Sequence, residues 1–129
     1  VLLVVFGVFF DAMMTRLTPD QSRSINDISQ RLFSSITNPF TALAVALAAG
    51  IGEEILFRGA LQPRIGIVAA ALLFAALHTQ YSLSLATVEI FILGLALGLL
   101  RKRAGLIPAI IGHTGYDFIL LMIPLVMHK

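Results

Sequence analysis

The chain has 129 residues, of which 58% are hydrophobic and 12% charged, and its mean hydropathy is +0.95. Ordinary soluble domains are much more polar, so this composition excludes that class and predicts a polytopic membrane protein. Cysteine is absent and the net charge is only +2, with scattered Lys and Arg, which excludes disulfides and thiolate chemistry and gives no reason to expect a nucleic-acid partner.

Residues 1–38 combine a short apolar segment with a polar connection. Val1 to Phe10 is apolar but shorter than the ~20 residues that cross a bilayer, so we expect a fragment that begins inside a span. From Asp11 to Asn38 the composition turns polar. Four apolar residues recur there at helical spacing, which is compatible with a short amphipathic helix on the membrane surface or with a loop. These residues are Ile25, Ile28, Leu32 and Phe33.

Residues 39–129 form a predicted core with four further apolar spans. Pro39 occupies a favourable first-turn position, and Pro63 and Arg64 close the first of these spans. The predicted spans cover residues 39–61, 65–78, 83–100 and 105–127, with a polar bend over 79–84. The expected fold is therefore all-α: a helical bundle of about five spans, the first one truncated, with a polar site between the helices.

Two adjacent carboxylates and an arginine interrupt the apolar sequence of the second span. An ionisable group at membrane depth costs several kcal/mol, so such groups face the protein interior and usually mark function. Glu54 and Arg58 share one helix face at i, i+4 and can form an ion pair, whereas Glu53 points about 100° away. We predict a structural ion pair and one free carboxylate. The alternative is a buried cluster that only ties helices together.

Two histidines also lie in apolar surroundings. His78 ends the third span, and His113 precedes Asp117 by four residues on one face of the fifth. A lone histidine on an apolar helix is more often a satisfied core group than a catalyst. With a free intramembrane carboxylate such as Glu53, however, the set meets the needs of general-base hydrolysis, in which one group takes a proton from water and others stabilise the oxyanion.

Other hydrolytic chemistries fit the sequence less well. Every serine lies in a polar connection and none in a Gly-x-Ser-x-Gly turn, which argues against a serine nucleophile. The HExxH zinc pattern is absent. Asp117 is the one aspartate within a predicted span, so an aspartic dyad lacks its second member. A site built on Glu53, His78 and His113 remains.

These residues resemble the CAAX-protease and bacteriocin-processing (CPBP, or Abi) family of intramembrane proteases, whose motifs read EExxxR, FxxxH and Hxxx(N/D). The motifs occur here, in order, as Glu53-Glu54 to Arg58, Phe74 to His78, and His113 to Asp117. The resemblance covers roughly residues 40–125. Each motif alone is common, but three in order, each in an apolar segment, form a specific pattern. Gly94 and Gly98 add a GxxxG spacing that lets another helix approach closely.

The resemblance implies that Glu53 and His78 activate a water that attacks a peptide bond. It also implies that His113 and Asp117 hold the oxyanion, while the ion pair described above is structural. Asp117 departs from the Asn found in the best-studied type of member, and an ionised Asp can only accept hydrogen bonds. Either it is protonated, or it orients His113 and leaves the oxyanion to other donors.

The depth of the site in the membrane raises a separate question. At a rise of 1.5 Å per residue, straight antiparallel spans would leave Glu53 and His78 about 10 Å apart in depth. A tilt, or a third helix that starts deeper, must bring the two together.

We predict an intramembrane endopeptidase of the CAAX-prenyl-protease-like or bacteriocin-processing type, without a cofactor, in a bacterial cell membrane. Its expected partners are the lipid bilayer and a membrane-associated peptide or protein substrate. One alternative is a zinc protease with Glu53, His78 and His113 as ligands. Another is a non-enzymatic transporter or immunity scaffold, for which Glu89 is the one extra intramembrane carboxylate and is isolated in the sequence. The basic triplet Arg101 to Arg103 favours a cytoplasmic loop between the last two spans.

Overall fold

The computed structural model describes residues 2–78 and 84–127, which form six α-helices and one π-helix. No strand occurs among these residues, so the all-α prediction is confirmed. Two helical segments, Pro39–Leu77 and Leu106–Val126, are long and apolar enough to cross a membrane. The elements are α1 (Leu2–Leu17), α2 (Pro19–Leu32), α3 (Pro39–Glu54), the π-helix η1 (Ile55–Leu61), α4 (Gln62–Leu77), α5 (Leu85–Ala104) and α6 (Leu106–Met127).

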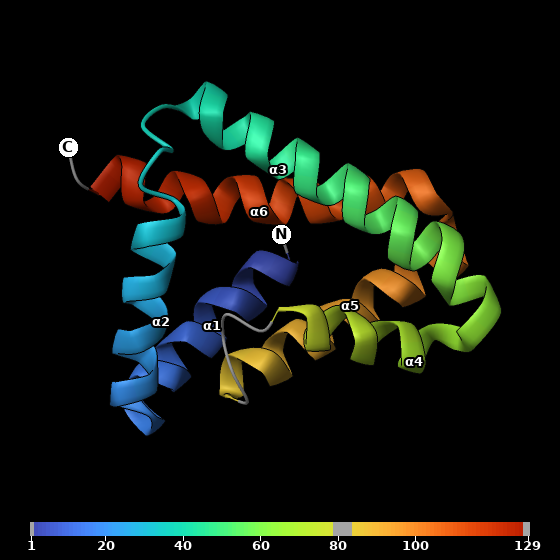
Figure 1. Ribbon diagram of the computed structural model, residues 1–129, viewed down its shortest axis with the longest axis horizontal. Coiled ribbons are helices and arrows are strands. Elements are labelled where there is room, and N and C mark those ends of the chain that lie inside the picture. The colour runs from blue at the N-terminus through green and yellow to red at the C-terminus, as the bar shows by residue number, and fades with distance from the viewer. Residues whose placement is uncertain (1, 79–83, 128–129) are drawn as a thin grey trace.

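Two antiparallel helix pairs form the body of the molecule (Figure 1). α3 packs along α6, and α4 packs along α5. The pairs are joined at one end, where η1 leads from α3 into α4 and Gly105 leads from α5 into α6. At the other end α1 contacts α5 and α6, and α2 packs on α1. One polar residue from each of α3, α4 and α6 is buried between the helices: Glu54, Gln62 and His113.

Local sequence signals set the ends of these helices. The Asn38 side chain accepts hydrogen bonds from the backbone N–H groups of Phe40 and Thr41, both at 3.0 Å, and Pro39 occupies the first turn. These contacts satisfy donors that the start of a helix leaves unpaired. Gly105 ends α5 with φ +101, a conformation that is favourable for glycine alone, and its N–H donates to the Arg101 carbonyl.

The chain bends at Gly66, inside the segment assigned to α4, where φ is +84. Figure 1 shows that the chain reverses direction between α3 and the end of α4. Glu53 precedes this bend by 13 residues and His78 follows it by 12. The segments from Glu53 to Gly66 and from Gly66 to His78 are thus nearly equal in length. The difference in depth between Glu53 and His78 that straight antiparallel spans would produce is therefore not expected here. The third predicted span is a short helix whose far end carries His78.

The N-terminal segment is more helical than its composition suggests. α1 continues past Phe10 to Leu17, because Phe10 and Met14 recur at i, i+4 and are buried against Ala86 of α5. The predicted polar connection therefore begins later than Asp11. Of the two readings left open for the connection, the amphipathic helix is the one found, as α2. The predicted bend over 79–84 lies, except for Ser84, outside the described residues.

Polar and apolar side chains are distributed inside out compared with a soluble protein. Glu54, Arg58 and His113 are at most 3% exposed, whereas Phe40 is 84% and Ile111 66% exposed. In a bilayer, outward apolar side chains contact lipid, and ionisable groups lie in the protein interior. The distribution is that of a membrane-embedded bundle.

α3 and α6 cross closely at Gly50. A Cβ atom at this position would clash with the Thr114 hydroxyl and lie 2.9 Å from the Thr114 backbone nitrogen. Gly50 is one turn before Glu54, and Thr114 directly follows His113. The crossing therefore fixes how closely Glu54 can approach His113.

Gly50→Ala is expected to lower the free energy of unfolding by about 1–3 kcal/mol, the usual cost of overpacking a core. Gly52→Ala is the matched control in the same helix, because a Cβ there meets no atom within 4 Å. The control should be neutral or slightly stabilising, since alanine is the better helix former. Unfolding of both variants in detergent micelles measures the difference, and equal stabilities would show that the crossing tolerates a methyl group.

Candidate active site

α3 widens into the π-helix η1 directly after the two carboxylates. The Gln62 N–H donates to the Phe57 carbonyl, five residues back, which is the π pattern. Such segments are rare and often occur at functional sites. Arg58 lies in the middle of η1 and is only 1% exposed. Its charge is therefore held inside the protein and needs partners there.

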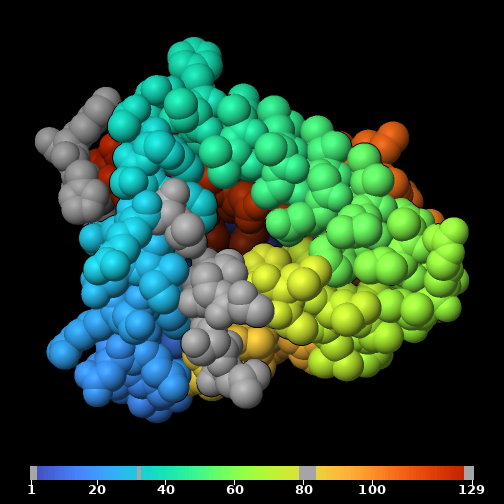
Figure 2. Space-filling view, viewed as in Figure 1, coloured from blue at the N-terminus to red at the C-terminus, as the bar shows by residue number. Residues whose placement is uncertain are grey.

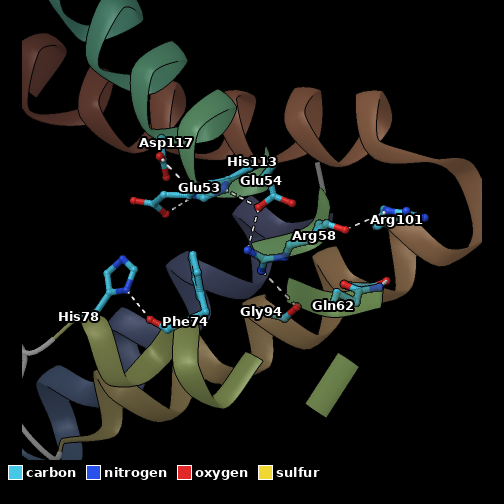
Figure 3. A network of polar contacts seen from close by, with 11 residues as sticks. Glu53, Glu54, Arg58, Gln62, Phe74, His78, Gly94, Arg101, His113 and Asp117 are labelled. Atoms are coloured by element: carbon cyan, nitrogen blue, oxygen red, sulfur yellow. Dashed lines mark hydrogen bonds and ion pairs between the residues drawn. The ribbon is translucent and has the colours of Figure 1, made fainter. Parts of the chain in front are cut away.

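One carboxylate oxygen connects Arg58 to His113 (Figure 3). Oε1 of Glu54 forms an ion pair with Nη1 of Arg58 at 2.9 Å and a hydrogen bond with Nδ1 of His113 at 2.9 Å. The ion pair has the predicted i, i+4 spacing. Because a carboxylate beside an arginine can only accept, the proton of this hydrogen bond lies on Nδ1 of His113. Glu54 thus fixes the ring orientation, a contact that sequence reasoning missed.

Phe74 lies between Arg58 and His78. The Arg58 guanidinium lies 4.3 Å from the centre of the Phe74 ring, within cation–π range. The same ring lies 4.8 Å from the His78 ring and makes an edge contact with Phe57 at 5.1 Å. Phe74 is 1% exposed, so this motif residue packs between the buried arginine and His78.

The two glycines of the predicted GxxxG pair line the contact between α5 and α4. A Cβ at Gly94 would lie 3.2 Å from the Ala71 Cβ, and one at Gly98 would lie 2.8 Å from an Ile67 methyl group. This approach leaves the glycine carbonyls within reach of buried side chains. Arg58 Nη2 donates to the Gly94 carbonyl at 3.2 Å, and Gln62 Nε2 donates to that of Gly98 at 2.9 Å.

The other ring nitrogen of His113 faces two carboxylates. Nε2 lies 3.5 Å from Oδ2 of Asp117 and 3.8 Å from Oε2 of Glu53. Both distances exceed a normal hydrogen bond. The side chains of Glu53 and Asp117 are 34% and 25% exposed, in contrast to the fully buried Glu54. Of the adjacent carboxylates Glu53 and Glu54, Glu53 is therefore the accessible one. Asp117 lies near Nε2 of His113, and not near Nδ1, which Glu54 contacts.

His78 is oriented by its own helix. Its Nδ1 lies 2.8 Å from the Phe74 carbonyl oxygen at the last turn of α4. A carbonyl can only accept, so Nδ1 carries the proton of this bond, and Nε2 is the nitrogen that can take one. In Figure 3 the His78 ring lies across an open space from Glu53.

The four predicted catalytic residues share one cavity of about 460 Å³. Figure 2 shows the hollow between α2, α3 and α4, with residues of α6 visible inside it. Glu53, His78, His113 and Asp117 line it, and most of its remaining wall is apolar. Glu89, which is isolated in the sequence, lines the same cavity. Its carboxylate accepts a hydrogen bond from the Tyr116 hydroxyl at 3.1 Å.

Comparison with known proteins identifies relatives of the part of the chain that holds this cavity. Residues 35–119 match the family described as type II CAAX prenyl endopeptidase Rce1-like. The chain is also 33% identical over 107 residues to the Bacillus subtilis (strain 168) protein named "Uncharacterized protein YpbD". That alignment covers 80% of this chain and 54% of the relative, so the chain spans about half the length of the curated relative it matches. No solved structure matches the chain.

Proposed function

The chain belongs to the Rce1-like family of type II CAAX prenyl endopeptidases, and on this premise we propose that it is an intramembrane protease of the glutamic type. Membership implies a membrane-embedded protease. The observation that supports the glutamic type is the division between the two adjacent carboxylates. Glu54 is paired with both Arg58 and His113, whereas Glu53 lines the cavity and forms no ion pair with an arginine or lysine among the described residues.

In this proposal Glu53 is the general base. It takes a proton from a water held between its carboxylate and Nε2 of His78, and the water oxygen attacks the carbonyl carbon of the peptide bond. The C–O bond forms as the carbonyl π bond opens into an oxyanion. When the C–N bond breaks, Glu53 returns the proton to the leaving nitrogen. The geometry supports these roles because Glu53 and His78 line one cavity from two different helices.

His113 and Asp117 are the proposed oxyanion donors. Because Glu54 holds the proton on Nδ1, Nε2 of His113 donates only when the ring is an imidazolium, and the surrounding carboxylates of Glu53 and Glu54 stabilise that charge. Asp117 lies 3.5 Å from the same nitrogen. An ionised Asp117 would repel an oxyanion there, so we propose that it carries a proton during the reaction and donates it as a hydrogen bond.

Asp117→Asn is expected to keep near wild-type activity at low pH and to exceed the wild type as pH rises. The amide keeps its donor at every pH, whereas the carboxyl loses its donor when it ionises. Asp117→Leu, of similar size but without a donor, should lose roughly 10²–10³ in rate, the usual cost of one oxyanion donor. Rates measured over a pH series for the three proteins decide the matter. If the Asn variant is as impaired as the Leu variant at every pH, Asp117 works ionised.

Cleavage of a peptide library tests the proposed function directly. The purified chain in lipid vesicles is incubated with membrane-associated peptides, both prenylated and unprenylated, and the products are identified by mass spectrometry. We propose an apolar, membrane-associated substrate in a bacterial membrane, because the cavity wall is largely apolar and the matched relative is bacterial. Cleavage of prenylated peptides alone would indicate the CAAX type. No cleavage by the wild type would leave the non-enzymatic scaffold as the better reading.

Metal analysis separates the glutamic type from a zinc type that uses Glu53, His78 and His113. In the described part of the chain, no group of three or more His, Asp or Glu side chains is arranged so that it could hold a metal ion. We therefore propose activity that survives a chelator, in protein whose zinc content is far below one atom per chain. Loss of activity on chelation, with recovery on addition of zinc, would overturn the glutamic assignment.

A further inference from the structure

The π-helix that carries Arg58 has a gap in its backbone hydrogen bonding. The Gln62 N–H donates to the Phe57 carbonyl, five residues back. In the same register the next carbonyl, that of Arg58, would accept from residue 63. Residue 63 is Pro63, which has no N–H. The π pattern and the proline together leave the Arg58 carbonyl without a backbone donor, at a point where Arg58 itself is buried.

Arg101 supplies the missing donor. Its Nε donates to the Arg58 carbonyl at 3.1 Å, across from α5 to η1 (Figure 3). Arg101 follows Gly94 by seven residues and Gly98 by three, so the three lie along one face of α5. This face exchanges three hydrogen bonds with η1 and the first residue of α4, two of them accepted by glycine carbonyls and one donated by Arg101.

We propose that Arg101 is a positioning residue for the proteolytic site. Arg101 holds the backbone of Arg58. The Arg58 guanidinium is paired with Glu54, and the Glu54 carboxylate in turn accepts the hydrogen bond from Nδ1 of His113. Each link is a single contact of 2.9–3.1 Å between buried or half-buried groups. The proposed catalytic role rests on the proposed function, whereas the hydrogen bond to η1 does not.

The two basic residues beside Arg101 distinguish this role from membrane anchoring. Lys102 and Arg103 are exposed, and within the described part of the chain neither side chain makes a hydrogen bond or an ion pair. If the triplet served only as a cytoplasmic anchor, its three positive charges would contribute equally, and removing any one of them would have the same effect. Lys102→Met therefore removes the same charge as Arg101→Met without touching η1, and it is the matched control.

Pro63→Ala tests the mechanism by restoring a backbone donor. Arg101→Met should reduce kcat roughly 10- to 100-fold with little change in KM, because it displaces catalytic groups without removing them. Lys102→Met should match the wild type. The double variant Arg101→Met/Pro63→Ala should recover most of the lost rate, because the new N–H at residue 63 can donate to the Arg58 carbonyl. An arginine that acted only through its charge or its packing would not be rescued by an amide hydrogen at residue 63, which is five residues from Arg58.

Hydrogen exchange provides a measurement that does not depend on activity. In the protein in vesicles, amide exchange of residues 55–62 should be faster in Arg101→Met, unchanged in Lys102→Met and slow again in the double variant. If the wild type cleaves no peptide, the proposed function fails while the exchange series still decides the role of Arg101. Identical behaviour of Arg101→Met and Lys102→Met would overturn the proposal. If Arg101→Met does not fold, folding of the double variant supports it, and failure of both overturns it.

Discussion

Glu53→Gln is expected to abolish proteolysis while the protein still folds and inserts. The amide has nearly the same shape as the carboxylate, but it cannot accept a proton from water, and loss of a general base costs roughly 10²–10⁴ in rate. Folding should be unaffected, because the Glu53 side chain is 34% exposed and its ion-pair contact, with His113, is 3.8 Å long. Cleavage rates and thermal unfolding of the same preparations measure both expectations.

Glu89→Gln is the matched control for this variant. It makes the same chemical change in the wall of the same cavity, at a carboxylate that takes no part in the proposed mechanism. We expect it to cleave the same peptides at a similar rate. If Glu53→Gln keeps most of its activity, Glu53 is not the base, and equal losses in the two variants would point to a general effect of charge in the cavity.

The difference between the two adjacent carboxylates was predictable from helical geometry. Glu53 and Glu54 had to point in different directions, and the i, i+4 spacing selected Glu54 as the partner of Arg58. The structure has this ion pair, with Glu54 fully buried. The spacing could not show that His113 would share the same oxygen, because that contact depends on how α6 lies against α3.

The features missed by sequence reasoning are those that depend on backbone register. The pattern of apolar residues does not distinguish an α-helix from a short π-helix, so η1 and the role of Arg101 could not be predicted. The bend at Gly66 had a signal in Pro63 and the glycine itself, but the expected break was placed at Pro63 and Arg64, two to three residues earlier. The predicted N-terminal span ended too early, at Phe10, because polar residues such as Asp11 and Arg16 indicate exposure and not the end of a helix.

The arrangement explains why the site tolerates so many charges at membrane depth. The positive Arg58 and the negative Glu54 compensate each other in the interior, and the guanidinium is further satisfied by the Gly94 carbonyl and the Phe74 ring. Glu53 and Asp117 then remain at the edge of the cavity, where water can reach them. The buried pair lies directly beside the proposed catalytic groups and contacts His113, so its removal should affect these groups indirectly.

Arg58→Leu is accordingly expected to destabilise the protein by about 3–5 kcal/mol, because it leaves the Glu54 carboxylate buried without its cation. Glu54→Gln should also be destabilising, since it strands the arginine, although its amide oxygen can still accept from Nδ1 of His113. The double variant removes both charges, so it should lose less unfolding free energy than the sum of the losses in the two single variants. Unfolding of the four proteins in detergent measures the cycle. Arg58→Leu protein that is normally stable but inactive would move Arg58 from the structural to the catalytic residues.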